Sequence, residues 1–189
     1  GGQEIDASGL IVFPGGVDVH THVAGGAINF ARAMTPEDHR RTQAFIRSQS
    51  RRSGIGGMAP TTFATGYLYA GMGFTTVNEA AVPALSARHT HEELGDIPIL
   101  DKSCLVLMAN NEIVLDLLEA GEYAQAKNIV AWYITAAKAY GVKAVNAGGV
   151  AAWKWGHDSK QLNSPIAGYH RLTPGDIIRQ LARIVDDLG

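Results

Sequence analysis

The chain has 189 residues, of which 46% are hydrophobic and 18% are charged, and its mean hydropathy is close to zero. This composition is typical of a globular protein with one sizeable core, and it excludes an intrinsically disordered chain. The formal net charge is −2, and the arginines between residues 40 and 52 are spaced as on a solvated helix face. We therefore expect no nucleic-acid partner.

No apolar stretch approaches the ~18 residues that a membrane-spanning helix needs, and the first residues lack the regions of a secretion signal. We therefore expect a cytoplasmic protein without a membrane partner. The single cysteine, Cys104, lies in an apolar run, so no internal disulfide can form and a buried thiol is expected.

Short apolar runs rich in β-branched residues alternate with longer helical patterns, which is typical of βα units around a parallel sheet. In chain order, the predicted elements are strand 10–19, helix 36–51, helix 61–72, strand 73–79, strand 103–108, helix 112–119, helix 123–140, strand 141–146 and helix 174–188. Gly25 and Gly26, and residues 53–60, are expected to form long loops. Two of the helices open with a Thr-Pro pair, which favours a helix start.

The first predicted strand runs into two histidines, His20 and His22, which are separated by one residue. Alternate side chains of a strand share a face, so both imidazoles should point the same way at its end. The alternative is a His-Thr-His triplet on the surface that binds no metal ion. The apolar run, the Pro-Gly-Gly break and Asp18 before the pair favour metal ligands instead, and histidine is the commonest metal ligand.

The fourth predicted strand contains Lys143, and a glycine-rich turn follows it. Burial favours the neutral amine of a lysine, and near two cations such an amine can take up carbon dioxide to become a carbamate. The carbamate is an anionic oxygen ligand, so Lys143 is a predicted bridging ligand between two metal ions. The alternative is an edge-strand lysine whose amine reaches water.

A second His-x-His sequence, His89 and His91, does not follow an apolar strand. These residues are expected in a loop or at a helix start. They are predicted to contact substrate rather than a metal ion.

Four βα units amount to half of a (β/α)8 barrel, which usually takes about 250 residues. The predicted fold is therefore α/β, with residues 1–189 forming the first half of a barrel domain. The second half and any N-terminal β-sandwich strands would be absent. An open α/β sheet is the alternative. A half barrel would expose apolar surface, so we expect it to need the missing half or other subunits.

The segment from Ile5 to His22 resembles the opening of the amidohydrolase superfamily, whose pattern is D-A-x-G, an apolar run and P-G-x-x-D-x-H-x-H. Further blocks resemble the N-terminal half of the catalytic A subunits of formylmethanofuran dehydrogenase and of the formyltransferase/hydrolase complex. These blocks are residues 56–67, 73–77, 87–93, 145–149 and 153–156.

This resemblance implies a zinc-dependent amidohydrolase that cleaves or forms the formamide bond of a formyl-furan one-carbon carrier. It implies two Zn²⁺ ions bridged by a carboxylated lysine, with His20, His22 and Lys143 as metal ligands and Asn146 as a substrate contact. The implied partners are the formyl carrier, a small molecule, and the other subunits of a hetero-oligomeric complex. The family's remaining ligands and its catalytic aspartate come from later strands, so the chain alone is expected to be inactive.

Two other functions stay open on the sequence. A cyclic amide hydrolase, similar to dihydroorotase or hydantoinase, would share the histidine pair and the lysine. A non-catalytic scaffold subunit would keep the fold without a functional metal.

Overall fold

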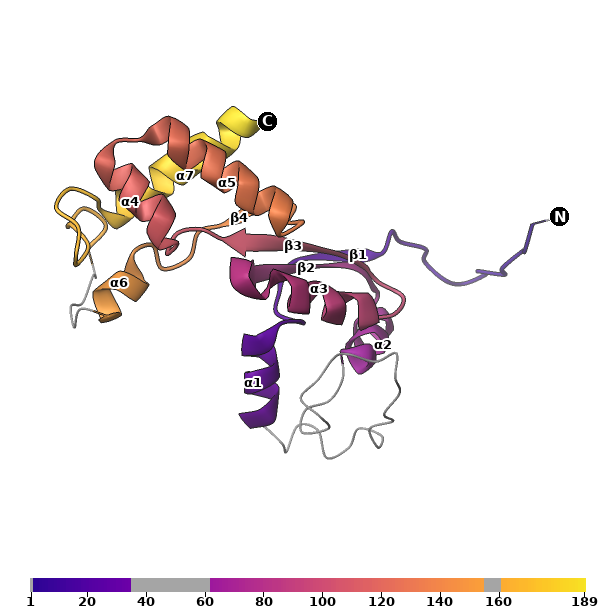
Figure 1. The fold of residues 1–189 in the computed structure, drawn as a ribbon. Helices are drawn as coiled ribbons and strands as arrows, with labels where there is room; N and C mark the ends of the chain where they lie inside the picture. The colour runs from indigo at the N-terminus through magenta and orange to yellow at the C-terminus, as the bar shows by residue number, and fades with distance from the viewer. Residues whose placement is uncertain (1, 35–61, 155–160) are drawn as a thin grey trace.

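The computed structural model describes residues 2–34, 62–154 and 161–189. Its centre is one parallel sheet of four strands, β1 (Gly16–Thr21), β2 (Phe74–Val82), β3 (Asp101–Leu107) and β4 (Gly141–Lys143). Each strand is hydrogen-bonded to its neighbour in sequence, in the order β1-β2-β3-β4 (Figure 1). A (β/α)8 barrel has this sequential order, whereas a doubly wound sheet reverses it. The predicted α/β half barrel is confirmed.

The helices between the strands follow the prediction in most places. They are α1 (Gly26–Met34), α2 (Phe63–Gly71), α3 (Ala87–Asp96), α4 (Glu112–Ala120), α5 (Tyr123–Ala136), α6 (Gly149–Lys154) and α7 (Pro174–Leu188), with a 3-10 turn η2 (Ala84–Ser86) before α3. The structure confirms α2, α4, α5 and α7. The helix predicted at 36–51 and the loop predicted at 53–60 lie outside the described residues.

Helix α7 begins where the Thr-Pro pair predicts. The Thr173 hydroxyl accepts the Asp176 backbone N–H at 3.1 Å, and the Asp176 carboxylate accepts the Thr173 backbone N–H at 3.1 Å. Pro174 occupies the first turn, where its missing N–H costs nothing. The two reciprocal bonds satisfy backbone donors that the helix itself cannot pair.

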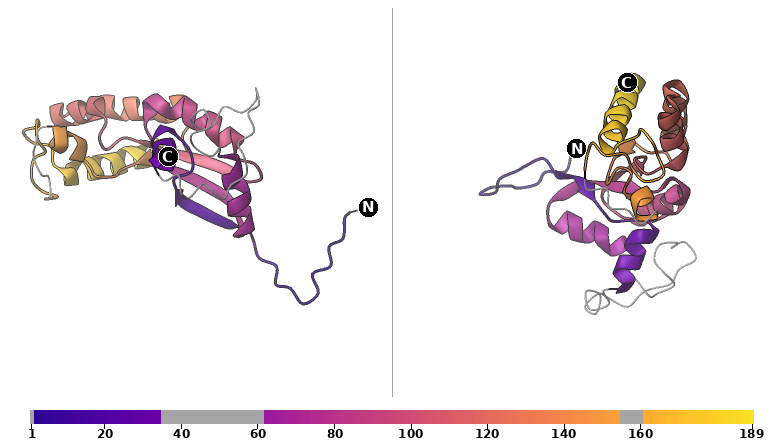
Figure 2. Two further views of the ribbon diagram at one scale, coloured as in Figure 1. Left: turned by 90° about the horizontal axis from the view of Figure 1, so that it is seen from below. Right: turned by 90° about the vertical axis from the view of Figure 1, so that its left-hand side faces the viewer.

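The first strand starts later than the apolar run suggests. The prediction placed it at 10–19, but β1 begins at Gly16 and extends to Thr21. Its partner β2 begins at Phe74, opposite Gly16, so the residues before Gly16 have no strand to pair with. The preceding apolar residues are 71–80% exposed, and this segment runs away from the sheet (Figure 2). The pairing partner therefore sets the start of the strand.

Helices α1 and α3 were not among the predicted helices. Gly25 and Gly26 were expected in a long loop, but α1 begins at Gly26, directly after Gly25 turns the chain with φ +105°. Residues 87–96 form α3, so His89 and His91 lie near a helix start, which is one of the two settings expected for them. The buried positions of α3 are Ala87, Thr90, Glu93 and Leu94. This spacing is helical, but two of its members are polar, so a search for apolar periodicity misses it.

The core lies between the sheet and the helices, and α4, α5 and α7 contact one another beside β4. Cys104 is 1% exposed, as predicted, and burial raises the pKa of its thiol. Among the residues described, no helix is long and apolar enough to span a bilayer.

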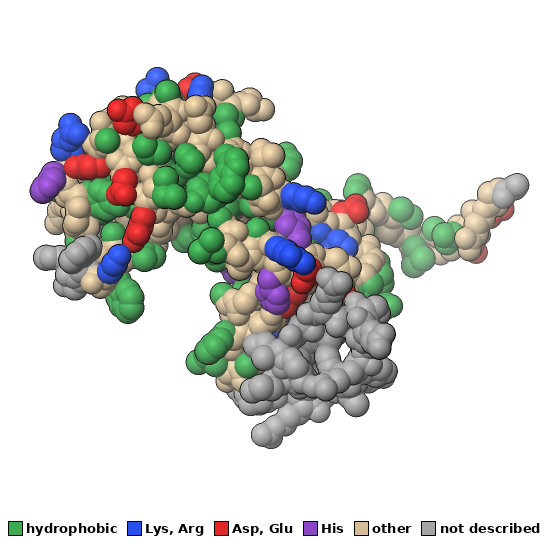
Figure 3. All heavy atoms as spheres, in the orientation of Figure 1, with side chains coloured by type: hydrophobic (Ala, Val, Ile, Leu, Met, Phe, Trp, Pro, Cys, Tyr) green, Lys and Arg blue, Asp and Glu red, His purple; other side chains and the backbone are tan. Residues whose placement is uncertain are grey.

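Apolar side chains also remain on the surface. Val17 and Val19 of the edge strand β1 are 59% and 70% exposed. Hydrophobic side chains gather over the helices α4, α5 and α7 and along the N-terminal segment (Figure 3). Exposed apolar surface of this kind is what an incomplete barrel leaves open.

Candidate metal centre

The two histidines of the first strand lie side by side at its carboxyl end. His20 is in β1, Thr21 ends the strand and His22 follows it. Thr21 is buried, with its hydroxyl 2.5 Å from the Tyr69 hydroxyl of α2, so its neighbours face the other way. The imidazole centroids of His20 and His22 are 5.3 Å apart, with ring planes at 89°. The period of the strand thus brings both rings to one face.

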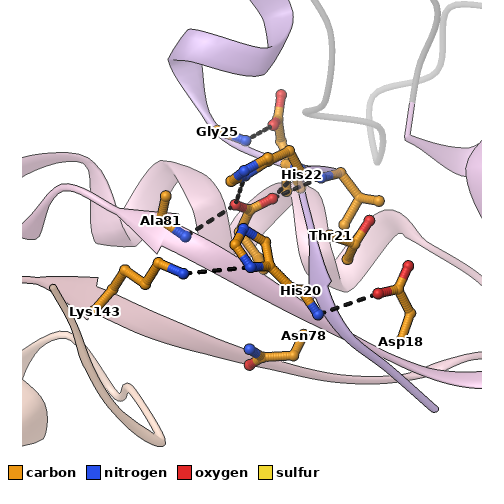
Figure 4. A network of polar contacts seen from close by, with 12 residues as sticks. Asp18, His20, Thr21, His22, Gly25, Asn78, Ala81 and Lys143 are labelled. Atoms are coloured by element: carbon orange, nitrogen blue, oxygen red, sulfur yellow. Dashed lines mark hydrogen bonds and ion pairs between the residues drawn. The ribbon is translucent and has the colours of Figure 1, made fainter. Parts of the chain in front are cut away.

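Lys143, the last residue of β4, reaches the same place from the opposite edge of the sheet. Its Nζ lies 3.3 Å from His20 Nδ1 (Figure 4). A lysine ammonium only donates hydrogen bonds, so His20 Nδ1 accepts in this arrangement. The contact spans β2 and β3, as expected for a sheet that curves into half a barrel. The structure therefore brings all three sequence-predicted ligands together at one rim.

Asp18, the acidic residue of the same motif, faces Tyr69 as Thr21 does, because the register of β1 shifts between Asp18 and Thr21. Its carboxylate accepts the His20 backbone N–H at 3.1 Å and the Tyr69 hydroxyl at 3.2 Å. Burial raises the pKa of Tyr69, so its hydroxyl remains a donor to Asp18. Asp18 thus ties the strand that carries the histidines to α2.

Glu79 of β2 contacts His22 of the histidine pair, and the sequence analysis did not single it out. Its side chain is 1% exposed, and its carboxylate lies 3.1 Å from His22 Nδ1. It also accepts the backbone N–H groups of Val23 at 2.6 Å, Ala24 at 3.1 Å and Ala81 at 3.2 Å. The available signal was a glutamate at the end of a predicted strand, directly before the apolar residues Ala80, Ala81 and Val82. Such a carboxylate, once buried, requires several donors.

Glu93 of α3 is a second buried carboxylate next to the same loop. It accepts the Gly25 backbone N–H at 2.5 Å and the side-chain amide of Asn29. His89 Nε2 lies 3.4 Å from Glu93, and the His89 side chain is 42% exposed. His89, a predicted substrate contact, therefore stands beside the loop that follows His22.

The other two predicted substrate contacts do not join this cluster. His91 Nε2 lies 2.8 Å from the Ala137 carbonyl oxygen, so its ring packs α3 against the end of α5. Asn146 is exposed in the turn after β4, where its carbonyl accepts the Asn110 side-chain amide at 3.1 Å. Among the described residues, neither side chain has a hydrogen bond to His20, His22 or Lys143.

The donors gathered at this rim are two imidazoles and one amine. Imidazole nitrogens suit zinc, and a lysine amine becomes an oxygen ligand once it is carboxylated. In the part of the chain that the structure describes, no group of three or more His, Cys, Asp or Glu side chains could hold a metal ion. The donor set thus fits one part of a zinc site, with further ligands still required.

The chain has relatives among known protein families and solved structures. Residues 3–185 match the model of the amidohydrolase family. The chain is 44% identical to Protein FwdA of Methanocaldococcus jannaschii over 98% of its length, and covers 32% of that protein. It is 36% identical to the A subunit of the Formyltransferase/hydrolase complex Fhc of Methylorubrum extorquens over 99% of its length, and covers 33% of it.

A solved structure shares the fold. The crystal structure of the formyltransferase/hydrolase complex FhcABCD from Methylorubrum extorquens, with methylofuran bound, matches with a TM-score of 0.78 at 32% sequence identity. The match covers 93% of this chain and 31% of the other chain. The chain thus spans about a third of the length of these relatives. By its sequence and its half barrel, it belongs to the amidohydrolase family.

Proposed function

We propose that this chain supplies the first half of a zinc-dependent amidohydrolase site that cleaves or forms the formamide bond of a formyl-furan carrier. The main support for the metal site is that His20, His22 and Lys143 lie close together at the carboxyl rim of the sheet. The similarity to the A subunit of the Fhc complex, and to a complex solved with methylofuran, supports the choice of carrier.

In this proposal, two zinc ions would be held by an imidazole nitrogen of His20, by one of His22 and by the carbamate of a carboxylated Lys143. The carbamate forms when the neutral amine of Lys143 attacks carbon dioxide and releases one proton. When bound, zinc would lower the pKa of a coordinated water and polarise the formyl oxygen. The position of Lys143 supports this role, because its Nζ lies 3.3 Å from the ring of His20 at the same rim of the sheet.

The proton that the leaving amine takes up must come from a group other than the three proposed metal ligands. Among the residues described, the carboxylates that contact residues 18–25 are Asp18, Glu79 and Glu93, and all three already accept hydrogen bonds from this segment. We therefore propose that the general acid lies in the remaining part of the full-length protein, and that these 189 residues alone are inactive.

The carrier would enter from the open side of the rim. Of the predicted substrate contacts, His89 fits best, because its partly exposed ring is oriented by Glu93 next to the site. Asn146 is exposed in the turn that directly follows Lys143 and its strand. We propose that other subunits of a complex cover the exposed apolar surface.

The test uses the full-length protein in complex with its partner subunits. Release of formate from a formyl-furan carrier, lost on removal of zinc and restored by its return, is the expected result. Cleavage of dihydroorotate or hydantoin without activity on the formamide would establish a cyclic amide hydrolase instead. No zinc after zinc-replete expression, together with no hydrolysis, would establish a scaffold role.

A further inference from the structure

Glu79 combines complete burial with an unusual concentration of hydrogen-bond donors. A carboxylate that is 1% exposed is costly unless donors replace its lost water. Here three backbone N–H groups and one imidazole nitrogen serve that purpose. Two of the backbone donors, from Val23 and Ala24, belong to the loop directly after His22.

The two oxygens of Glu79 divide these donors in a way that determines the state of His22. Oε2 accepts from the loop backbone, at Val23 and Ala24. Oε1 faces His22 Nδ1 at 3.1 Å and accepts from Ala81. An ionised carboxylate can only accept, so Nδ1 of His22 must carry the proton. The neutral ring then keeps its lone pair on Nε2.

We propose that Glu79 is a positioning residue, which fixes the tautomer and the orientation of His22 so that Nε2 is presented to zinc. This inference rests on the proposed function, since it requires His22 to be a metal ligand. A metal-bound histidine usually donates its other N–H to such a partner, and loss of the partner typically weakens metal affinity by about 10–100-fold.

Glu93 offers a matched control within the same molecule. It is also fully buried, and it also accepts a backbone N–H from the loop after β1, at Gly25. Its imidazole partner is His89 and not a predicted metal ligand. A comparison of Glu79→Gln with Glu93→Gln thus separates the orientation of His22 from general anchoring of the loop.

The experiment measures the zinc dissociation constant of the full-length, metal-free protein by competition with a chromophoric chelator. We expect the zinc dissociation constant to rise by about 10–100-fold for Glu79→Gln and to change by less than about threefold for Glu93→Gln. Equal losses for the two variants would overturn the positioning role. His22→Ala is the reference: if it leaves zinc affinity unchanged, the metal site itself is wrong. If only His22→Ala weakens binding, the role of Glu79 alone is wrong.

A second measurement avoids any dependence on how the variants fold. Nitrogen-15 labelling of histidine in the wild-type, metal-free protein reports which ring nitrogen of His22 carries the proton. We expect protonated Nδ1 and unprotonated Nε2 at a pH where the ring is neutral. The opposite tautomer would overturn the inference without reference to zinc or to activity.

Discussion

The close approach of α2 to the segment before β3 gives a stringent test of the fold around the site. Gly66 of α2 is buried against Pro98, and a Cβ added there would lie 2.3 Å from the Pro98 carbonyl oxygen and 2.7 Å from its Cδ. Helix α2 carries Tyr69, whose hydroxyl contacts Thr21 and Asp18 on either side of His20. The substitution Gly66→Ala therefore tests a contact that holds the histidine-bearing strand.

Two opposing effects determine how much Gly66→Ala lowers the free energy of opening of α2. Overpacking usually costs about 1–3 kcal/mol, and the upper end applies here because the obstructing atom is a backbone oxygen. Replacing a helical glycine with alanine returns about 1 kcal/mol through helix propensity. The net loss is about 2 kcal/mol in the free energy of opening of α2, which corresponds to roughly 30-fold weaker protection.

Hydrogen exchange of the α2 amides in the full-length protein, followed by mass spectrometry, measures this loss directly. Gly71→Ala is the control, because it lies in the same helix and a Cβ there would meet nothing within 4 Å. We expect its protection to be unchanged or slightly increased. Wild-type protection in Gly66→Ala, or an equal loss in both variants, would refute the predicted packing of α2.

Three further predictions concern single side chains. Lys143→Arg keeps a positive charge but cannot form a carbamate, so we expect the bound zinc of the full-length protein to fall, as measured by elemental analysis. The Thr173 hydroxyl and then Arg179 hold the pKa of Asp176 below its ordinary 3.8. Its contribution to the stability of α7 is therefore complete above about pH 3.8 and lost as the pH falls through the lower folded value. Hydrogen exchange of α7 between pH 2 and 6 should show this loss, and Asp176→Asn should remove that dependence. Because the Cys104 thiol is buried with a raised pKa, it should react with iodoacetamide only after unfolding; labelling at the rate of a free thiol would contradict its burial.

Much of the architecture could be predicted because local patterns and global fold agree. The four strands were located by β-branched runs, and α7 by its Thr-Pro start. The helix α3 was not predicted, since its buried Thr90 and Glu93 side chains are polar and form hydrogen bonds. The start of β1 was not predicted either, because the partner strand decides which residues of an apolar run become paired.

Some residues of the candidate site could also be predicted from the sequence, and others could not. His20, His22 and Lys143 could be named from motif and strand position, because parallel strands end at a common rim. Glu79 and Glu93 could not be given a role, because their donors are backbone N–H groups of a loop more than fifty residues away in sequence. Only the folded arrangement reveals which buried carboxylate faces which amide.

The zinc content of the full-length protein with the histidine pair replaced shows whether this pair binds metal. The double variant His20→Ala/His22→Ala removes both imidazoles at the rim, whereas His170→Ala removes one whose backbone contacts Glu119 elsewhere. Elemental analysis after zinc-replete expression should find about two zinc ions in the wild type and in His170→Ala, and a clear loss in the double variant. Undiminished zinc in the double variant would show that His20 and His22 are not zinc ligands.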